Sequence, residues 1–370
     1  MRGPFKEVPP ELWRSYHWQI QNRIRTKQEL QKYLCLTPEE EEGIDTTAGL
    51  YPMAITPYYL SLINPEDPQD PIRLQAVPRK VEVEETIQSL GEPDPFREEG
   101  HIPGLTHRYP DRVLFTVTTF CAVYCRHCMR KRIFQEGERA RNKEEIDRFI
   151  EYLKAHREVR EVLLSGGEPL SLSNEKLRYV LSRIREVRHV DIIRIGTRLP
   201  VLAPQRFFDG ELLKILEEHS PVWISTHFNH PVEITEEAAE AVDRLLRHGI
   251  PVNNQTVLLK GINDDPQVML WLMRELLKIK VRPVYLFHCD PVKGAIHFRT
   301  SLEKGLEIME YLRGRIGGMG MPTYAVDLPG GKGKVPLLPQ YILDRSGDTY
   351  TFRSPLGGLV EYTLPYEEVS

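Results

Sequence analysis

Hydrophobic and polar positions divide the chain into a polar, proline-rich first part and a second part with a regular alternation. From Arg112 onward, short apolar runs rich in β-branched and aromatic residues alternate with longer stretches in which apolar residues recur every three or four positions. The first pattern is typical of buried strands and the second of amphipathic helices. The predicted strands are Arg112–Thr119, Val159–Leu164, Asp191–Gly196, Val222–Thr226, Val252–Leu258 and Val281–Phe287. The predicted helices are Asn142–His156, Asn174–Val187, Arg206–His219, Thr235–His248, Pro266–Lys278 and Ser301–Arg315.

Six strand–helix units joined by short connections predict right-handed crossovers and a parallel sheet. Because six units are too few for a closed eight-fold barrel, we expect an α/β fold, a partial (β/α)6 TIM-like barrel. A doubly wound sheet is the alternative, since periodicity alone does not distinguish it from a partial barrel. In both folds the C-terminal ends of the strands carry the functional site.

The regions on either side of these units have different patterns. Residues 1–100 predict a helical and extended region, residues 101–328 the barrel, and residues 329–370 a glycine-rich loop with a short β-containing tail. In the first region, Leu12–Leu34 predicts one or two amphipathic helices, and Thr37 predicts an N-cap before a solvated acidic turn, Glu39–Glu42. The prolines between Asn64 and Glu99 predict extended connections with at most one short helix. Turn signals in Tyr341–Tyr362 predict strands.

Composition narrows the class of protein. The chain has 370 residues, of which 41% are hydrophobic, and a formal net charge of -4, so it can bury a large core and has no basic field for nucleic acid. It has no apolar run long enough to span a bilayer and no signal-peptide core, so we expect a cytoplasmic protein without a membrane partner. Five cysteines, three of them clustered, do not form a secreted disulfide framework and suit a reducing compartment.

The clustered cysteines are the main candidate for chemistry. Cys121, Cys125 and Cys128 have the spacing C-x3-C-x2-C and follow the first predicted strand. Thiolates this close together on a loop can bind a metal centre, and three ligands on a four-iron cluster would leave one iron open for a substrate. The alternative is structural zinc, which usually needs a second pair of cysteines that this chain lacks.

This spacing after the first strand of a β/α array resembles the radical S-adenosylmethionine (SAM) superfamily. The resemblance implies a [4Fe–4S] cluster that binds SAM at its open iron and cleaves it to a 5′-deoxyadenosyl radical. Ser165, Gly166, Gly167 and Glu168, at the end of the second predicted strand, match the turn that binds the amino group of SAM. There the glycines would let the backbone approach the ligand, with free N–H and C=O groups to hold it.

Further polar residues at strand ends predict one pocket. His227 and Gln255 are assigned to SAM binding. The complete set is Thr197, Arg198, His227, Asn229, His230, Asn254 and Gln255.

A lysine in a glycine-rich segment is the second candidate. The segment Asp327-L-P-G-G-K-G-K-V-P lacks the Walker spacing and the following Ser or Thr of a phosphate-binding loop. It is then either a flexible surface loop or the loop of a Schiff-base lysine for pyridoxal phosphate (PLP).

The chain as a whole resembles the lysine 2,3-aminomutase family. The matching segments are W-Q-I-Q-N-R-I, L-T-P-E-E-E-E-G, G-L-T-H-R-Y-P-D-R, C-x3-C-R-H-C-x-R-x-R, S-T-H-F-N-H-P, H-C-D, H-F-R-T and P-G-G-x-G-K-x-P. The resemblance implies the partial barrel and places PLP on Lys334, although Lys332 stands where a glycine is usual and is a second candidate. It also implies that Arg108, Tyr109 and Arg112 line the PLP site.

The same resemblance implies the substrate contacts. Arg130 would pair with the substrate carboxylate, and Asp290 and Asp327 would receive the ε-ammonium group of lysine. The expected reaction is the conversion of L-lysine to β-lysine (3,6-diaminohexanoate) by 2,3-amino migration, an isomerase activity. Three alternatives remain: a 2,3-aminomutase for glutamate or another amino acid, a supplier of β-lysine for modification of a translation factor, and a non-catalytic Fe–S or zinc-binding protein.

Longer members of this family bind structural zinc at a subunit interface. Here Asp265 stands at one ligand position and the C-terminal cysteines are missing, so no structural zinc is expected. The expected partners are the amino acid substrate, a reducing electron donor and further copies of the chain in a homo-oligomer.

Overall fold

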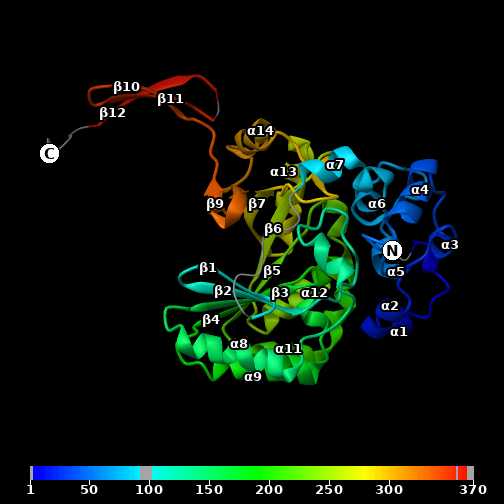
Figure 1. Ribbon diagram of the computed structural model, residues 1–370. Coiled ribbons are helices and arrows are strands. Elements are labelled where there is room, and N and C mark those ends of the chain that lie inside the picture. Colours follow the sequence, from blue (N-terminus) through cyan, green and yellow to red (C-terminus); the bar gives the residue numbers. More distant parts are fainter. Residues whose placement is uncertain (1–2, 92–101, 356, 365–370) are drawn as a thin grey trace.

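A nine-stranded sheet forms the centre of the molecule. The computed structural model describes residues 3–91, 102–355 and 357–364. The strands follow one another in the sheet in chain order (Figure 1). They are β1 (Leu105–Tyr109), β2 (Arg112–Thr118), β3 (Glu161–Gly166), β4 (Ile192–Gly196), β5 (Val222–Thr226), β6 (Val252–Leu258), β7 (Arg282–His288), β8 (Thr323–Leu328) and β9 (Gly333–Pro336).

Strands β2 to β8 are parallel, and the antiparallel strands β1 and β9 flank them. A doubly wound sheet would reverse its strand order at a switch point, whereas this order never reverses. The sheet is a nearly closed barrel of six β/α units completed by β8, which confirms the partial barrel. The connecting helices are α8 (Lys143–Ala155), α9 (Asn174–Arg185), α11 (Gly210–Glu218), α12 (Glu236–Arg247), α13 (Pro266–Lys278) and α14 (Leu302–Leu312).

The sequence specifies where each of these helices begins. A Ser, Thr, Asn or Asp precedes every one of the six, and its side chain accepts a backbone N–H of the first turn, which the helix itself leaves unpaired. These N-caps are Asn142, Ser173, Asp209, Thr235, Asp265 and Ser301.

Alternation along the strands separates core from cavity. In β3, Val162 and Leu164 are fully buried in the core, whereas Leu163 and Ser165 line an interior cavity. In β7, Tyr285 and Phe287 line the same cavity. Because side chains of a strand point alternately to its two faces, each strand contributes to both the core and the site.

The N-terminal region packs against one side of the barrel and is more helical than expected (Figure 1). Three short helices replace the one or two predicted over Leu12–Leu34, and the proline-rich segment contains two α-helices. Prolines start four of the helices instead of interrupting them, because the first helical position needs no backbone N–H. The helices are α1 (Pro10–Trp13), α2 (Tyr16–Gln21), α3 (Lys27–Leu30), α4 (Pro38–Thr47), α5 (Pro57–Leu60), α6 (Pro71–Ala76) and α7 (Glu85–Leu90).

The acidic turn at the start of α4 is only partly solvated, which corrects the prediction. Thr37 caps the helix as expected, in a reciprocal capping box with Glu40. Glu40 itself is fully buried and forms an ion pair with Arg73, whose Nη2 lies 2.7 Å from Glu40 Oε2. The pairing partner lies 33 residues away, so the local pattern could not indicate it.

The C-terminal part contains a second, separate sheet. The glycine-rich segment, predicted as a loop, ends in strand β9, and the predicted tail strands are β10 (Ile342–Ser346), β11 (Thr349–Arg353) and β12 (Leu359–Thr363). Figure 1 shows this sheet projecting from the barrel. The predicted boundary at residues 100–101 lies outside the described residues, and the division into three regions stays a prediction. None of the described helices has the length and apolar character to cross a membrane.

Candidate active site

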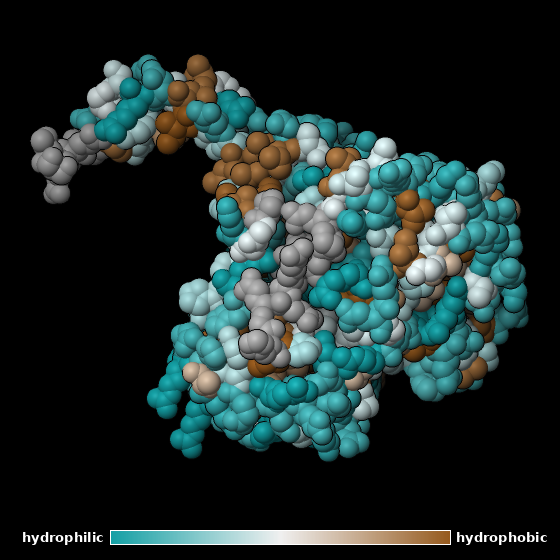
Figure 2. Space-filling model, in the orientation of Figure 1, coloured by the Kyte–Doolittle hydropathy of each residue, from teal (hydrophilic) through white to brown (hydrophobic). Residues whose placement is uncertain are grey.

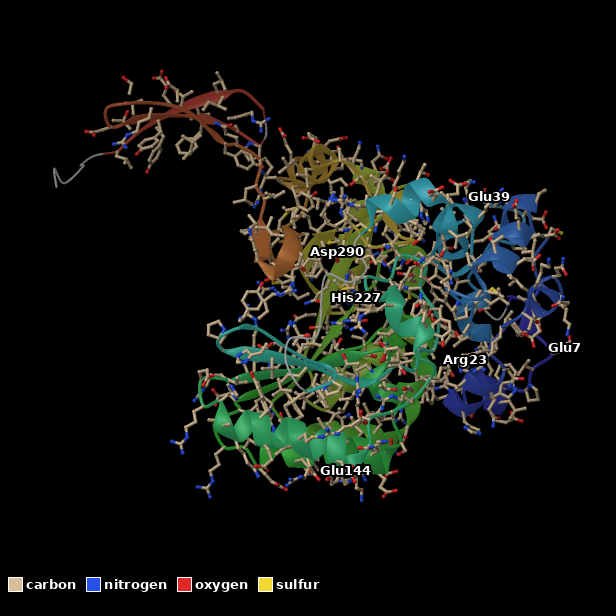
Figure 3. The ribbon with its side chains drawn as sticks, in the orientation of Figure 1. Glu7, Arg23, Glu39, Glu144, His227 and Asp290 are labelled. Atoms are coloured by element: carbon tan, nitrogen blue, oxygen red, sulfur yellow. The ribbon has the colours of Figure 1, made fainter. Side chains whose placement is uncertain are left out.

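One interior cavity of about 630 Å³ lies inside the barrel and is lined by residues from both ends of its strands. Figure 3 shows His227 and Asp290 in the middle of the molecule, whereas Glu7, Glu39 and Glu144 lie at its periphery. All sixteen residues to which the sequence analysis gives a catalytic, cofactor-binding or substrate-binding role line this cavity. They are Arg108, Tyr109, Arg112, Cys121, Cys125, Cys128, Arg130, Ser165, Gly166, Gly167, Glu168, His227, Gln255, Asp290, Asp327 and Lys334.

The three cysteines lie on the loop that follows β2. Burial raises the pKa of Cys121 well above its ordinary value and that of Cys128 to about 11, and the neighbouring thiols add to both shifts. The thiols of Cys121 and Cys128 are therefore protonated at neutral pH, and a metal centre would displace their protons on binding. Two donors already point at sulfur: the backbone N–H of Arg130 lies 3.3 Å from Cys128 Sγ, and Arg198 Nη1 lies 2.8 Å from Cys125 Sγ.

The cysteines therefore fit a metal cluster. They converge from one loop on one cavity and lie close enough to disfavour each other's ionisation. Soft thiolates are the ligands that iron–sulfur clusters take. Within the described part of the chain, no three His, Cys, Asp or Glu side chains are grouped to hold a single metal ion.

A network of buried ion pairs connects the cysteine loop to the N-terminal region. Glu82, in the 3-10 helix Lys80–Val83, accepts hydrogen bonds from Arg126 Nη2 at 2.6 Å and from Lys131 Nζ. Burial raises the pKa of Glu82, but the two cations outweigh that effect and lower it to about 2. Lys131 also donates to the Gly294 carbonyl at 2.6 Å, so this network joins the N-terminal region, the cysteine loop and the segment that follows β7. Sequence reasoning missed it, because Glu82 and Gly294 lie far from the cysteine loop in the chain and no local pattern joins them to Arg126 and Lys131.

The glycine turn at the end of β3 packs on the backbone that leads into the cysteine loop. The Gly167 N–H donates to the Thr118 carbonyl at 2.7 Å, and the Glu168 N–H donates to the Phe120 carbonyl at 2.6 Å. These two N–H groups are therefore already hydrogen-bonded within the protein, and the prediction that this turn binds SAM stays a prediction. A Cβ atom on Gly167 would lie 2.1 Å from the Phe120 oxygen, so glycine is required because the turn packs on the backbone that leads into the cysteine loop.

The carboxyl group of Glu168 is buried behind this turn. It accepts the hydroxyl hydrogen of Thr197 and the backbone N–H of Arg198, the latter at 2.9 Å. Burial raises the pKa of Glu168 to about 7, although these hydrogen bonds oppose the shift.

Only part of the polar strand-end set reaches the cavity. Thr197, Arg198, His227 and Gln255 line it, and His227 Nδ1 donates to the Gln255 carbonyl at 2.5 Å. Burial, together with the Arg198 charge, lowers the pKa of His227 to about 4, so its ring is neutral and Nε2 is an acceptor. The remaining members have structural roles and do not line the cavity: Asn254 binds the Phe228 backbone, Asn229 accepts the Val257 N–H, and His230 caps the turn Pro231–Glu233.

Lys334 enters the cavity from β9. Its register partner across the strands is Asp327 of β8, and its Nζ lies 3.3 Å from Asp327 Oδ2. Tyr109 accepts the Lys334 backbone N–H at 3.0 Å. Lys332 is exposed and is not among the residues that line the cavity.

Two carboxylates face this lysine. Burial raises the pKa of Asp290 to about 7, and the charge of Asp327 adds to the shift. The side chain of Asp327 is only 7% exposed, and its Oδ1 is buried without a hydrogen-bond partner in the described chain. A buried acceptor without a donor is costly. The site is therefore suited to a ligand that brings a cationic donor.

Cationic side chains lie on the other walls of the cavity. Arg130 Nη1 donates to Ser165 Oγ at 2.7 Å, which places a guanidinium between the cysteine loop and the end of β3. Arg112 stacks on the Tyr109 ring at 3.9 Å. A Cβ atom on Gly331 would lie 3.3 Å from Arg108 Nε, so the glycine-rich segment lies directly against Arg108. Guanidinium groups in such positions suit carboxylate and phosphate groups.

An aromatic pair on β7 is a further part of the wall that sequence reasoning did not identify. Tyr285 and Phe287 stack with their ring centres 4.9 Å apart, and Lys334 Nζ lies 5.1 Å from the Phe287 ring centre. Their spacing of two residues in a predicted strand was the available signal, because such residues share one face.

Comparison with known proteins identifies the family. The model of the radical SAM superfamily matches residues 115–272, and the model named lysine-2,3-aminomutase matches residues 309–370. The L-lysine 2,3-aminomutase of Clostridium subterminale is 47% identical over 98% of this chain and 86% of its own length. The chain belongs to the lysine 2,3-aminomutase family. A protein of Aquifex aeolicus (strain VF5) that carries the provisional name of an L-lysine 2,3-aminomutase is 74% identical over 98% of both chains.

Membership in this family has two consequences. The chain is an isomerase of the aminomutase class, and the cofactors of the family are a [4Fe–4S] cluster, SAM and PLP. The family also includes a different specificity: the glutamate 2,3-aminomutase of Clostridioides difficile (strain 630) is 46% identical over 95% of this chain and 83% of its own length. The substrate must therefore be inferred from the cavity.

Proposed function

We propose that this chain converts L-lysine to β-lysine by 2,3-amino migration. Cys121, Cys125 and Cys128 would hold the cluster, and Lys334 would hold PLP. Ser165, Gly166, Gly167, Glu168, His227 and Gln255 would surround SAM, and Arg108, Tyr109 and Arg112 would surround PLP. When bound, the cluster and SAM supply a carbon radical that removes and returns a hydrogen atom, while PLP holds the nitrogen that migrates.

The observation that carries the choice of lysine is the buried, unsatisfied oxygen of Asp327 beside Asp290. An ε-ammonium group supplies a hydrogen-bond donor for Asp327 Oδ1 and a second positive charge beside Lys334 for the two carboxylates. Arg130, near the cysteine loop, would bind the substrate carboxylate. The side chains of the protein thus orient a substrate with a carboxylate at one end and a cation at the other, and hold it away from water.

Glutamate is the second candidate, because an enzyme with that specificity is a close relative. Its side-chain carboxylate would lie against Asp290 and Asp327, and like charges at short distance in a buried site repel. We therefore expect little turnover of glutamate.

A substrate panel tests the proposal. The chain, reconstituted anaerobically with iron, sulfide and PLP and supplied with SAM and a reductant, is incubated with L-lysine, L-glutamate or L-arginine, and β-amino acids are measured by mass spectrometry. We expect β-lysine as the main product. A preference for glutamate or arginine would refute the choice of substrate.

The carboxylates are tested separately from the cofactors. We expect D290N and D327N each to lower kcat/KM for lysine by about 30-fold or more, since truncating one partner of a buried charge pair costs about 2–5 kcal/mol. D243N, which changes an acid paired with Arg247 on the surface of α12, is the matched control and should retain wild-type activity. Full lysine turnover by D327N would contradict the assignment.

We further propose that the enzyme needs a reducing electron donor and forms a homo-oligomer. The second point is supported by the C-terminal sheet, where apolar side chains are exposed on the surface (Figure 2). Ile342, Phe352 and Val360 are aligned across its three strands, and Tyr350 is aligned with Tyr362. An apolar face without a covering element is typical of an interface.

A further inference from the structure

Arg198 connects the cysteine loop with a buried polar group outside the cavity. It follows β4 and precedes the short helix α10 (Leu199–Leu202). Its Nη1 lies 2.8 Å from Cys125 Sγ, and its Nε donates to the His227 carbonyl at 2.9 Å. Its Nη2 donates to Glu233 Oε1 at 2.7 Å and to Gln75 Oε1 at 2.6 Å. The residue is 7% exposed, so water competes little with these contacts.

The partners of Arg198 are themselves fixed. Glu233 is fully buried and accepts the Tyr59 hydroxyl hydrogen at 2.8 Å and the Asn229 backbone N–H at 2.6 Å. Gln75 donates to the same carboxylate at 3.1 Å. Because a guanidinium is planar, holding Nε and Nη2 also fixes the direction of Nη1, which points at the sulfur.

A fixed cationic donor at a thiolate has a defined effect on a cluster bound there. The guanidinium keeps its proton at every accessible pH, and it stabilises negative charge on the sulfur and on the irons that the sulfur binds. The reduced cluster carries one more negative charge than the oxidised cluster and gains more from this contact. Hydrogen bonds to the sulfur ligands are one of the factors that set reduction potentials.

The sulfur atoms of Cys128 and Cys125 accept hydrogen bonds from different kinds of donor. Cys128 Sγ receives a neutral donor, the Arg130 backbone N–H at 3.3 Å. The charged contact is to Cys125. The effect expected at Cys125 is therefore larger, because hydrogen bonds with an ionised donor are about twice as strong as neutral ones.

We propose that Arg198 is a positioning residue that donates a charged hydrogen bond to Cys125 and thereby raises the reduction potential of the cluster. The inference rests on the proposed assignment of Cys121, Cys125 and Cys128 as the cluster ligands. Through Glu233 and Gln75, it also extends the control of that potential to the N-terminal region.

The test is a redox titration of the full chain, reconstituted anaerobically without SAM and followed by electron paramagnetic resonance. We expect R198M to shift the equilibrium toward the oxidised cluster by tenfold or more, which is about 59 mV for a one-electron couple. R198K keeps the charge but not the fork of donors, and should give a smaller shift in the same direction.

A second variant is expected to shift the potential in the opposite direction. E233Q removes the carboxylate that partly neutralises Arg198, so the guanidinium acts more strongly on Cys125 and the potential rises. General loosening of the fold would not produce shifts of opposite sign in R198M and E233Q. This pair of signs separates tuning of the cluster from a structural role.

Arg73 provides a matched control. It is also buried, and its Nε and Nη2 each lie 2.7 Å from a Glu40 oxygen, but it does not line the cavity. R73M should lose stability from the same kind of broken ion pair and keep the wild-type potential.

The outcomes separate the two proposals. A wild-type potential in R198M with full iron content overturns the role of Arg198, even if the enzyme makes β-lysine. If R198M does not retain four irons, R198K and E233Q decide the question. Wild-type potentials in both of these variants would overturn the role of Arg198. A wild-type chain that binds no cluster refutes the proposed function itself.

Discussion

Asp290 makes lysine binding sensitive to pH near neutrality. Burial, together with the nearby Asp327, raises the pKa of Asp290 from 3.8 to about 7. Only the ionised carboxylate pairs with an ammonium group, and protonation occurs as the pH falls through 7. We therefore expect KM for L-lysine to rise about tenfold for each pH unit below 7, with a smaller change in kcat. Initial rates from pH 5.5 to 8.5 measure this dependence.

The control for this prediction is D290N, which has no carboxyl group to titrate. Its KM should be high and nearly independent of pH over the same range. A wild-type KM that stays constant between pH 5.5 and 7 would show that Asp290 is ionised throughout and that the prediction is wrong.

At the scale of residues, the sequence predicts which side chains line the cavity but not the buried ion pairs that hold these side chains in place. The cysteines, Lys334 and Asp327 could be found because they belong to short motifs at strand ends. Glu82 and Glu233 could not, since their partners Arg126 and Arg198 lie 44 and 35 residues away and no local pattern joins them. The packing of Gly167 on the Phe120 backbone could not be predicted either, because a motif does not show which backbone lies next to a glycine.

The turn that follows β3 packs tightly against the backbone between β2 and the cysteine loop. In G167A, the new methyl group would lie 2.1 Å from the Phe120 oxygen, and a backbone atom cannot move aside cheaply. We expect a loss of roughly 3 kcal/mol in the free energy of unfolding and reduced iron retention, because Phe120 leads into the cysteine loop. Urea denaturation of the chain without cofactors and iron analysis after reconstitution measure these effects.

Gly210 gives the matched control for this substitution. It begins α11, and a Cβ atom there meets nothing within 4 Å. G210A should be neutral or stabilise the protein by about 0.5–1 kcal/mol, since alanine loses less backbone entropy in a helix. Equal stability and iron content in G167A and the wild type would contradict the packing argument.

At the scale of elements, periodicity located all six strand–helix units but missed the strands that flank them. The repeating units have long apolar runs and capped helices, whereas β9 is four residues long and contains both a glycine and a proline. Its strand structure comes from pairing with β8, which is a tertiary interaction. The helices of the N-terminal region were underestimated for a similar reason, because a proline at a helix start resembles a breaker until the neighbouring contacts are known.

At the scale of the whole molecule, the barrel followed from the sequence, whereas the contribution of the N-terminal region to the site did not. Gln75, Glu82 and Tyr59 come from that region and contact residues at or beside the cysteine loop or the end of β4. Hydrophobic patterns predict that such a region is helical, but they do not predict the surface that it covers.

The C-terminal sheet should be needed for assembly but not for the stability of the barrel. No described residue of β10–β12 is fully buried, and Arg353 of this sheet forms an exposed ion pair with Glu310 of α14. Exposed pairs contribute about 0–1 kcal/mol. A chain ending at Gln340 should therefore keep its barrel and sediment as a monomer, whereas the full chain sediments as an oligomer.

A point variant tests the same surface without removing the sheet. Val360 lies opposite Phe352 on its apolar face, so V360E would place a charge in the proposed interface. T351K, which changes the neighbouring position of β11 on the opposite face, is the control. If the apolar face joins two copies, the Tm of the wild type and of T351K rises with protein concentration, because association stabilises the folded chain. The Tm of V360E should be independent of concentration. Assembly of V360E at wild-type concentrations would show that the subunits associate through another surface.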